Sequence, residues 1–207
     1  MLTNETASVS EDLLADSYLL NSILYADPEQ MDKKSTDERI STLCEALREA
    51  GAHKVAAKFS EFQKKLWKIT SDEHMFALEM TPTSPPYLGH YGFDAPKSCG
   101  EIGVSERNIY MIEIAAVYKH YGMVMEHGEM PDYVPAVNEF LAISLAEKHP
   151  ESRILRRGYI DSLVSPFLPK LKKGFKGKPW ALLIEATELL IELEVNDKIR
   201  VMNNELE

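Results

Sequence analysis

The stretch GEMPDYVPAVNEFL, residues 128–141, joins the signals of a helix start to an apolar helix face. We expect Asp132 to cap this helix, because its carboxylate can accept hydrogen bonds from the unpaired N–H groups of the first turn. Pro135 stands in that turn, where its missing N–H costs nothing. Apolar residues then recur at spacings of three and four, at Val134, Val137, Leu141 and Leu145. The stretch therefore predicts an amphipathic helix with one buried face.

Helical signals continue on both sides of this stretch. Capping boxes, in which a serine or threonine stands three positions before a glutamate, open segments at Ser8, Ser35 and Thr70. Further helices are predicted from about residue 53 to 69, from Ser105, from Pro150 to about Leu163, and from Pro179 to Val195. The Ser105 helix is apolar almost all the way round, so we expect it at the centre of the molecule. Because no stretch alternates as a strand would, the sequence predicts an all-α fold, a single-domain helical bundle over residues 1–207 with about eight or nine helices.

Residues 81–103, TPTSPPYLGHYGFDAPKSCGEIG, interrupt this helical pattern. They contain four prolines, four glycines and several aromatic side chains. A long irregular stretch inside a compact domain is uncommon, and such stretches are often functional or mobile. We expect a functional or mobile loop here, within the helical domain.

The composition excludes some classes of protein. The 207 residues carry a formal net charge of −10. Such a chain repels phosphate backbones, so nucleic-acid binding is disfavoured and basic partners are favoured. The N-terminus lacks the regions of a signal peptide, and no apolar run reaches the roughly 20 residues of a membrane span. We expect a cytoplasmic protein without stable membrane insertion, in which Cys44 and Cys99 are reduced thiols.

The sequence shows no clear site for chemistry. It contains none of the common catalytic or nucleotide-binding motifs, and its six histidines lack the spacing of metal ligands. We therefore expect no catalytic residue, no metal and no cofactor. One cationic cluster stands out, formed by Lys170, Lys172, Lys173, Lys176 and Lys178, with Arg153, Arg156 and Arg157 shortly before it. It indicates either a solvated surface or a site for a phosphate-bearing ligand or an acidic partner.

Two places in the chain resemble motifs of a known family. The first is an acidic–Pro–Asp helix start, made of Glu129, Pro131 and Asp132 and continued by Glu139, Phe140 and Leu141. Tyr133 stands where the family frequently has a histidine. The second is a short helix followed by a Pro-rich segment, with Glu73, Phe76, Leu78, Pro82, Pro85, Pro86, Tyr87 and Tyr91, and with Glu79 near the family's usual phenylalanine. Both resemble the NarJ/TorD/DmsD-type redox-enzyme maturation chaperones, as does the order of the helices.

This resemblance implies an all-helical, non-enzymatic chaperone. Such a protein binds the N-terminal region or twin-arginine signal of the apo catalytic subunit of a molybdopterin oxidoreductase, and holds it for cofactor insertion before assembly or export. Molybdenum-cofactor delivery proteins are further implied partners. The implied client-binding residues are Glu129, Pro131, Asp132, Tyr133, Tyr87, Tyr91, Glu73 and Phe76. Glu129, Asp132 and Tyr87 rank first among them, whereas Phe76 and Phe140 are expected mainly in the core.

A cationic and apolar N-terminal segment needs an apolar groove with carboxylates at its rim. We expect the Pro-rich loop and the helix after residue 132 to form this groove, with Tyr87 and Tyr91 as anchors and with Glu129 and Asp132 meeting positive charge. Two alternatives remain open. One is a small helical nucleotide- or phosphate-binding protein or enzyme that uses the Lys170–Lys178 cluster. The other is an adaptor subunit that stays in a finished complex through the Pro179–Val195 helix.

Overall fold

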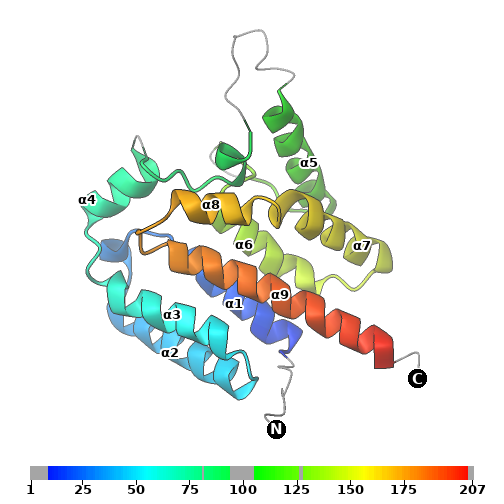
Figure 1. Cartoon of the computed structure of the whole chain (residues 1–207), viewed down its shortest axis with the longest axis horizontal. Coiled ribbons are helices and arrows are strands. Elements are labelled where there is room, and N and C mark those ends of the chain that lie inside the picture. Colours follow the sequence, from blue (N-terminus) through cyan, green and yellow to red (C-terminus); the bar gives the residue numbers. More distant parts are fainter. Residues whose placement is uncertain (1–8, 81, 94–104, 126–127, 205–207) are drawn as a thin grey trace.

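The computed structural model describes residues 9–80, 82–93, 105–125 and 128–204, with side chains as far as Val195. Within these residues the molecule is a helical bundle with nine α-helices and no strand, so the predicted all-α fold is confirmed (Figure 1). The helices are α1 (Glu11–Ile23), α2 (Lys33–Glu49), α3 (His53–Leu66), α4 (Ser71–His74), α5 (Glu106–His120), α6 (Val134–Ile143), α7 (Pro150–Tyr159), α8 (Leu168–Gly174) and α9 (Ala181–Asn204). None of the described helices is long and apolar enough to cross a membrane.

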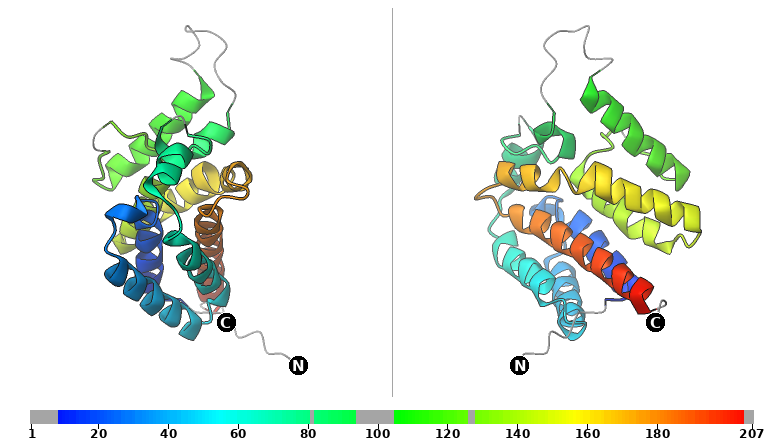
Figure 2. Two further views of the ribbon diagram at one scale, coloured as in Figure 1. Left: turned by 90° about the vertical axis from the view of Figure 1, so that its left-hand side faces the viewer. Right: turned by 45° about the vertical axis from the view of Figure 1, so that its right-hand side comes forward.

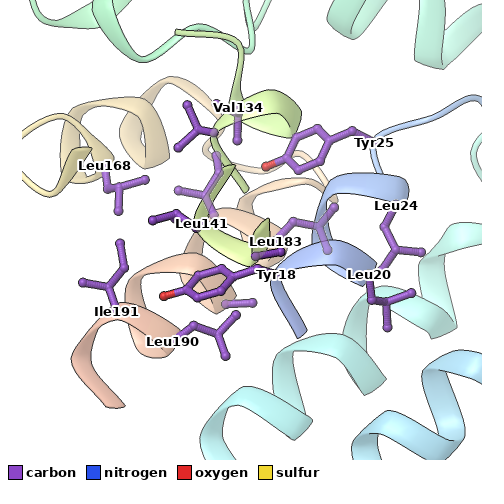
Figure 3. Close-up of a cluster of buried hydrophobic side chains, with 14 of the residues drawn as sticks. Tyr18, Leu20, Leu24, Tyr25, Val134, Leu141, Leu168, Leu183, Leu190 and Ile191 are labelled. Atoms are coloured by element: carbon purple, nitrogen blue, oxygen red, sulfur yellow. The ribbon is translucent and has the colours of Figure 1, made fainter. Parts of the chain in front are cut away.

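The centre of the bundle is built around α1, α6 and α9. Helix α1 packs against α6 and α9, and α3 also packs against α9. Their apolar side chains meet in one core, shown in Figure 3, which includes Tyr18, Leu20, Leu141, Leu183, Leu190 and Ile191. The apolar stripe predicted for the segment after residue 132 is confirmed, because Val134, Val137, Leu141 and Leu145 are all buried. Burial of that stripe is the main reason why the segment forms a helix here.

A small polar network ties the three central helices together. The Asn21 side-chain amide donates to the Thr187 hydroxyl at 2.8 Å and to the Leu183 carbonyl at 3.0 Å. The Thr187 hydroxyl donates in turn to the Asn138 side-chain oxygen at 2.9 Å. Asn21, Asn138 and Thr187 are fully buried. Buried polar groups that bond to one another fix the register of the helices that carry them.

Helix α5 does not lie at the centre, contrary to the prediction. Figures 1 and 2 show it at the edge of the bundle, where it packs against α7 and against the short turn η3 (Leu88–Tyr91). Its buried face is formed by Tyr110, Ile114, Val117 and Tyr118. Ile109 and Ile112 face outward and are 53% and 64% exposed. Tyr110 and Tyr118 provide much of the apolar surface that packs against the bundle, and Ile109 and Ile112 on the other side of the helix stay exposed to solvent.

Helix starts follow the predicted signals in part. Thr70 and Glu73 form the predicted capping box, and Ser105 caps α5 as expected. Helix α2 begins earlier than predicted, because Asp32 and not Ser35 accepts the first-turn hydrogen bond. Ser10 caps α1, whereas the predicted cap Ser8 lies outside the described residues.

Candidate binding surface

Asp132 lies just before α6 but does not cap it. The helix begins at Val134, Tyr133 occupies the N-cap position, and no side chain there makes a capping hydrogen bond. The Val134 N–H donates to the Pro86 carbonyl at 2.8 Å, and Pro135 has no N–H to satisfy. The predicted capping role of Asp132 is therefore wrong, because the turn finds other partners for its first N–H groups.

The Asp132 carboxylate instead holds a distant segment in place. It is fully buried, and its Oδ2 accepts a hydrogen bond from the Gly89 backbone N–H at 2.9 Å. A guanidinium nitrogen of Arg107 lies 3.8 Å from the same oxygen. Burial raises the pKa of Asp132, while the Gly89 N–H and Arg107 oppose the rise. This burial does not fit the expected role of Asp132 as a direct contact to positive charge on a client.

Residues 82–93, called the strap below, cross the start of α6. Tyr87 and Tyr133 form an antiparallel bridge, and the Leu88 N–H donates to the Asp132 carbonyl at 3.0 Å. The strap then continues into η3, which packs on α8 and α5 (Figure 1). Residue 81 and residues 94–103 of the predicted loop, including Cys99, lie outside the described residues. The bridge brings together the two sequence motifs that resemble the chaperone family.

Tyr87, Tyr133 and Glu129 form a cluster where the strap meets the turn before α6. The two tyrosine rings lie 5.5 Å apart, and the Tyr87 hydroxyl donates to Glu129 Oε1 at 3.1 Å. Burial, with Glu129 and Glu79 nearby, raises the pKa of Tyr133 to about 12. Burial and Glu129 likewise raise the pKa of Tyr87. Both hydroxyls are therefore neutral donors near neutral pH, next to a partly exposed carboxylate.

Tyr91 and Pro131, two further candidates, serve the packing of the strap. Tyr91 lies against α8 so closely that a Cβ added at Gly174 would be 2.2 Å from Tyr91 Cε1. Burial raises the pKa of Tyr91 to about 12. The Pro131 carbonyl accepts from the Tyr118 hydroxyl at 3.0 Å. Since Tyr91 and Pro131 are each half-buried and engaged internally, we assign them to positioning the strap.

Glu73 and Phe76 belong to α4 and to the π turn η2 (Met75–Glu79) that continues it. Glu73 accepts from the Thr70 N–H at 3.1 Å, within the capping box. In η2 the hydrogen bonds span five residues, as from the Met80 N–H to the Met75 carbonyl at 2.8 Å. Phe76 and Met80 face outward and are 59% and 58% exposed. The expectation that Phe76 lies in the core is therefore wrong, whereas Phe140 is fully buried as expected.

An open groove of about 590 Å³ lies beside α4 and η2. Its apolar lining includes Ile69, Phe76, Ala77, Pro179 and Trp180. Its charged lining consists of Lys65, Lys68, Lys178, Asp72 and Glu73. Lys178 comes from the cationic cluster, and two lysines from the end of α3 join it. Two residues of the second motif, Glu73 and Phe76, and one residue of the lysine cluster, Lys178, thus line the same groove.

Four of the other cations are paired with carboxylates of the protein. Three of them pair with carboxylates: Lys172 with Glu188, Arg153 with Glu11, and Arg157 with Asp161. Arg156 is 2% exposed, and its guanidinium binds the buried Glu194 carboxylate at 2.7 Å. Within residues 170–178, Lys172 is paired and Lys178 borders the groove, and the expected anion site over this cluster stays a prediction.

The groove and the strap belong to one surface. Phe76 lines the groove, and the Thr83 N–H at the start of the strap donates to the Phe76 carbonyl at 3.3 Å. Glu79 of the same π turn lies near Tyr133. Tyr133 in turn packs against Tyr87, which binds Glu129. We call this area the strap surface; it consists of the groove together with Phe76, Glu79, Met80, Tyr87, Glu129 and Tyr133. Of the eight predicted client-binding residues, Glu73 and Phe76 line the groove, Tyr87, Glu129 and Tyr133 lie on the adjoining part of the surface, and Asp132, Tyr91 and Pro131 are engaged in packing. The groove lies beside α4, and not between the Pro-rich loop and α6 as we expected.

No family model matches this chain, and no curated protein matches it either. The described residues contain no group of three or more His, Cys, Asp or Glu side chains that could hold a metal ion. Sequence reasoning missed Met80, Trp180, Lys65 and Lys68. A signal for Met80 was present, since it follows Phe76 by four positions, but this spacing is equally typical of a buried helix face.

Proposed function

We propose that this protein is an assembly chaperone of the NarJ/TorD/DmsD type. On this proposal, its strap surface binds the N-terminal region or twin-arginine signal of the apo catalytic subunit of a molybdopterin oxidoreductase. The supporting observation is the outward position of Phe76 and Met80 beside the groove, because neighbouring large apolar side chains left uncovered commonly mark an interaction site. Glu79 and Glu129 add negative charge to the same surface. This combination suits a segment that is both apolar and cationic, as export signals are.

The proposed mechanism is binding without bond chemistry. Burial of the client's apolar side chains against Phe76, Met80 and the groove contributes most of the affinity, at roughly 25 cal/mol per Å² of apolar area. The Met80 side chain is unbranched and adapts to ligands of different shape. Glu79 and Glu129 speed the encounter with a cationic segment and orient it, an effect that salt screens. While the segment is bound, the apo subunit stays in the assembly pathway.

The decisive experiment is affinity purification from the protein's own host under assembly conditions, followed by mass spectrometry. Three tagged proteins are compared: wild type, the double variant Phe76→Glu/Met80→Glu, and the control Ile154→Glu. Ile154 is 73% exposed on α7, so the control also places a charge on an exposed apolar site. We expect an apo or precursor molybdoenzyme subunit with wild type and control, and its loss with the double variant. Recovery of the protein alone, or equal recovery with all three, contradicts the proposal.

A second candidate function is the binding of a nucleotide or another phosphate-bearing ligand in the groove. The observation in its favour is that Lys65 and Lys68 join Lys178 there. We place it second because all three lysines are exposed, so each ion pair with a phosphate contributes little to the affinity. Saturable binding of a nucleoside triphosphate at one site per chain, lost in the Lys178→Gln variant, would favour phosphate binding over the chaperone function.

The adaptor alternative places a partner on the Pro179–Val195 helix, one face of which is apolar. That face is occupied: Leu183, Ile184, Ala186 and Leu190 are fully buried in the core. A partner would therefore have to bind the outer, acidic face of this helix, at Glu185, Glu188 and Glu192, or another surface.

A further inference from the structure

Positive and negative charge are separated along the strap surface. Three exposed lysines, Lys65, Lys68 and Lys178, border the groove. Beyond Phe76 lie the carboxylates of Glu79 and Glu129. Near Glu129 the buried Asp132 carboxylate lies 3.8 Å from its cationic partner Arg107, so carboxylates outnumber cations among these groups. Glu79 lies 3.5 Å from His74 Nδ1 and still has a 63% exposed side chain, so it can meet a cation from solvent. The surface is thus cationic at one end and anionic at the other, with apolar side chains between.

The two carboxylates of the groove do not reverse this polarity. Glu73 is engaged by the Thr70 N–H at 3.1 Å, as part of the capping box. Asp72 stands in the first turn of α4, where the unpaired N–H groups of the helix start favour negative charge. Both carboxylates are therefore partly compensated within the protein. The three lysines come from the end of α3 and from the turn before α9, and they leave the groove with an excess of positive charge.

We propose that the segment recognised by the strap surface is itself polarised. It carries basic residues at one end, over Glu79 and Glu129, and one or two acidic residues at the other end, over Lys65, Lys68 and Lys178. Its central apolar residues cover Phe76 and Met80 and enter the groove. This inference rests on the proposed function and deepens it, because it names a second recognition element that a cationic signal alone does not have.

We expect the acidic residues of the segment to raise its affinity only modestly, and to matter mainly for which segments are selected. Each exposed ion pair changes affinity only by a small factor, and three lysines acting on two acidic residues give about tenfold in total. The effect falls with rising salt, because these side chains are exposed. Apolar burial keeps the segment bound even when the pairs are lost. Polarity therefore selects among apolar segments and fixes their direction on the surface.

The test uses three synthetic peptides and the full-length protein, with fluorescence anisotropy as the readout. The first peptide has two arginines, a central apolar run and two glutamates; the second replaces the glutamates by glutamine, and the third replaces the arginines by glutamine. They are titrated into wild type, into Lys65→Gln/Lys68→Gln/Lys178→Gln, and into a control. The control, Lys34→Gln/Lys54→Gln/Lys119→Gln, changes the net charge equally at exposed lysines outside the groove.

We expect wild type and the control to bind the first peptide about tenfold more tightly than the second at low salt, and the groove variant to bind both alike. If wild type binds these two peptides equally, or if the control behaves like the groove variant, the polarity is overturned. The proposed function survives that result as long as Phe76→Glu/Met80→Glu abolishes binding. If wild type binds none of the three peptides, the proposed function itself fails.

Discussion

The Asp132 carboxylate accepts a hydrogen bond from the backbone N–H of Gly89, 43 positions earlier in the chain, at 2.9 Å. This contact joins the strap to the turn before α6 at a fully buried point. The bridge between Tyr87 and Tyr133 lies next to it in both segments. The buried Asp132 side chain therefore fixes the position of the strap relative to the turn before α6.

Replacing Asp132 by alanine and by asparagine separates its two contributions. Asp132→Ala removes the acceptor for the buried Gly89 N–H and leaves a small void, so we expect a loss of about 2–4 kcal/mol of unfolding free energy. Asp132→Asn keeps an oxygen at the same place and should cost less than about 1 kcal/mol. Urea unfolding of the three proteins measures both values. Equal losses in the two variants would show that the hydrogen bond to Gly89 contributes little.

The raised pKa of Asp132 predicts that the free energy of unfolding depends on pH. Burial raises the pKa of Asp132, so the folded state binds this proton more tightly than the unfolded state does. The resulting stabilisation is fully present below the ordinary aspartate pKa of about 4 and is lost as pH rises through the folded-state pKa. The unfolding free energy of wild type minus that of Asp132→Asn should therefore fall from pH 4 to pH 7. Urea unfolding of both proteins across this range tests it, and a difference that grows with pH would contradict it.

The sequence predicted the fold from local signals that tertiary contacts did not override. The apolar stripe from Val134 to Leu145 is buried, and the caps at Thr70 and Ser105 are where the pattern placed them. Such signals depend on residues within one or two turns, which is why they can be read without knowledge of the fold. Helix α5 is the exception, since its all-round apolar pattern indicated burial without saying which side would find a neighbour.

The candidate site was predicted less completely, because it depends on contacts between distant residues. Asp132 has the sequence of a helix cap, yet its partner is Gly89, which no local pattern identifies. Arg156 was grouped with the other cations, although it pairs with Glu194, 38 positions later. Phe76 has helical spacing typical of a core residue, yet it lies in the π turn η2 with its side chain 59% exposed, because no distant segment among the described residues covers it.

Gly174 is predicted to be required for docking of the strap. In Gly174→Ala the new Cβ would lie 2.2 Å from Tyr91 Cε1, so the ring must move, and the nearby bond from the Ser84 hydroxyl to the Gly174 carbonyl is disturbed. We expect a loss of about 1–3 kcal/mol in urea unfolding. Gly158→Ala is the matched control, because Gly158 lies within α7 and an added Cβ there has no neighbouring atom within 4 Å. This variant should be more stable than wild type by about 0.5–1 kcal/mol, since alanine favours the helix over glycine.

A double variant tests whether the close contact with the Tyr91 ring causes the loss of stability in Gly174→Ala. If the ring of Tyr91 is what the alanine strikes, Tyr91→Ala combined with Gly174→Ala should cost clearly less than the sum of the two single changes. Strictly additive losses would mean that Gly174 matters for a reason other than Tyr91.

The buried pair of Arg156 and Glu194 leads to the last prediction. The guanidinium makes two hydrogen bonds to the carboxylate, at 3.1 and 2.7 Å, and the Tyr18 hydroxyl lies 3.5 Å from Glu194 Oε2. Arg156→Leu leaves a buried carboxylate without its cation, and we expect a loss of about 3–5 kcal/mol. Arg156→Leu/Glu194→Leu removes both charges and should recover most of that loss, because the desolvation cost of the pair disappears with it. Urea unfolding of wild type, both single variants and the double variant forms a double-mutant cycle. A double variant as unstable as the sum of the singles would mean that the two side chains stabilise the bundle independently, through packing, and that their charges do not act as a pair.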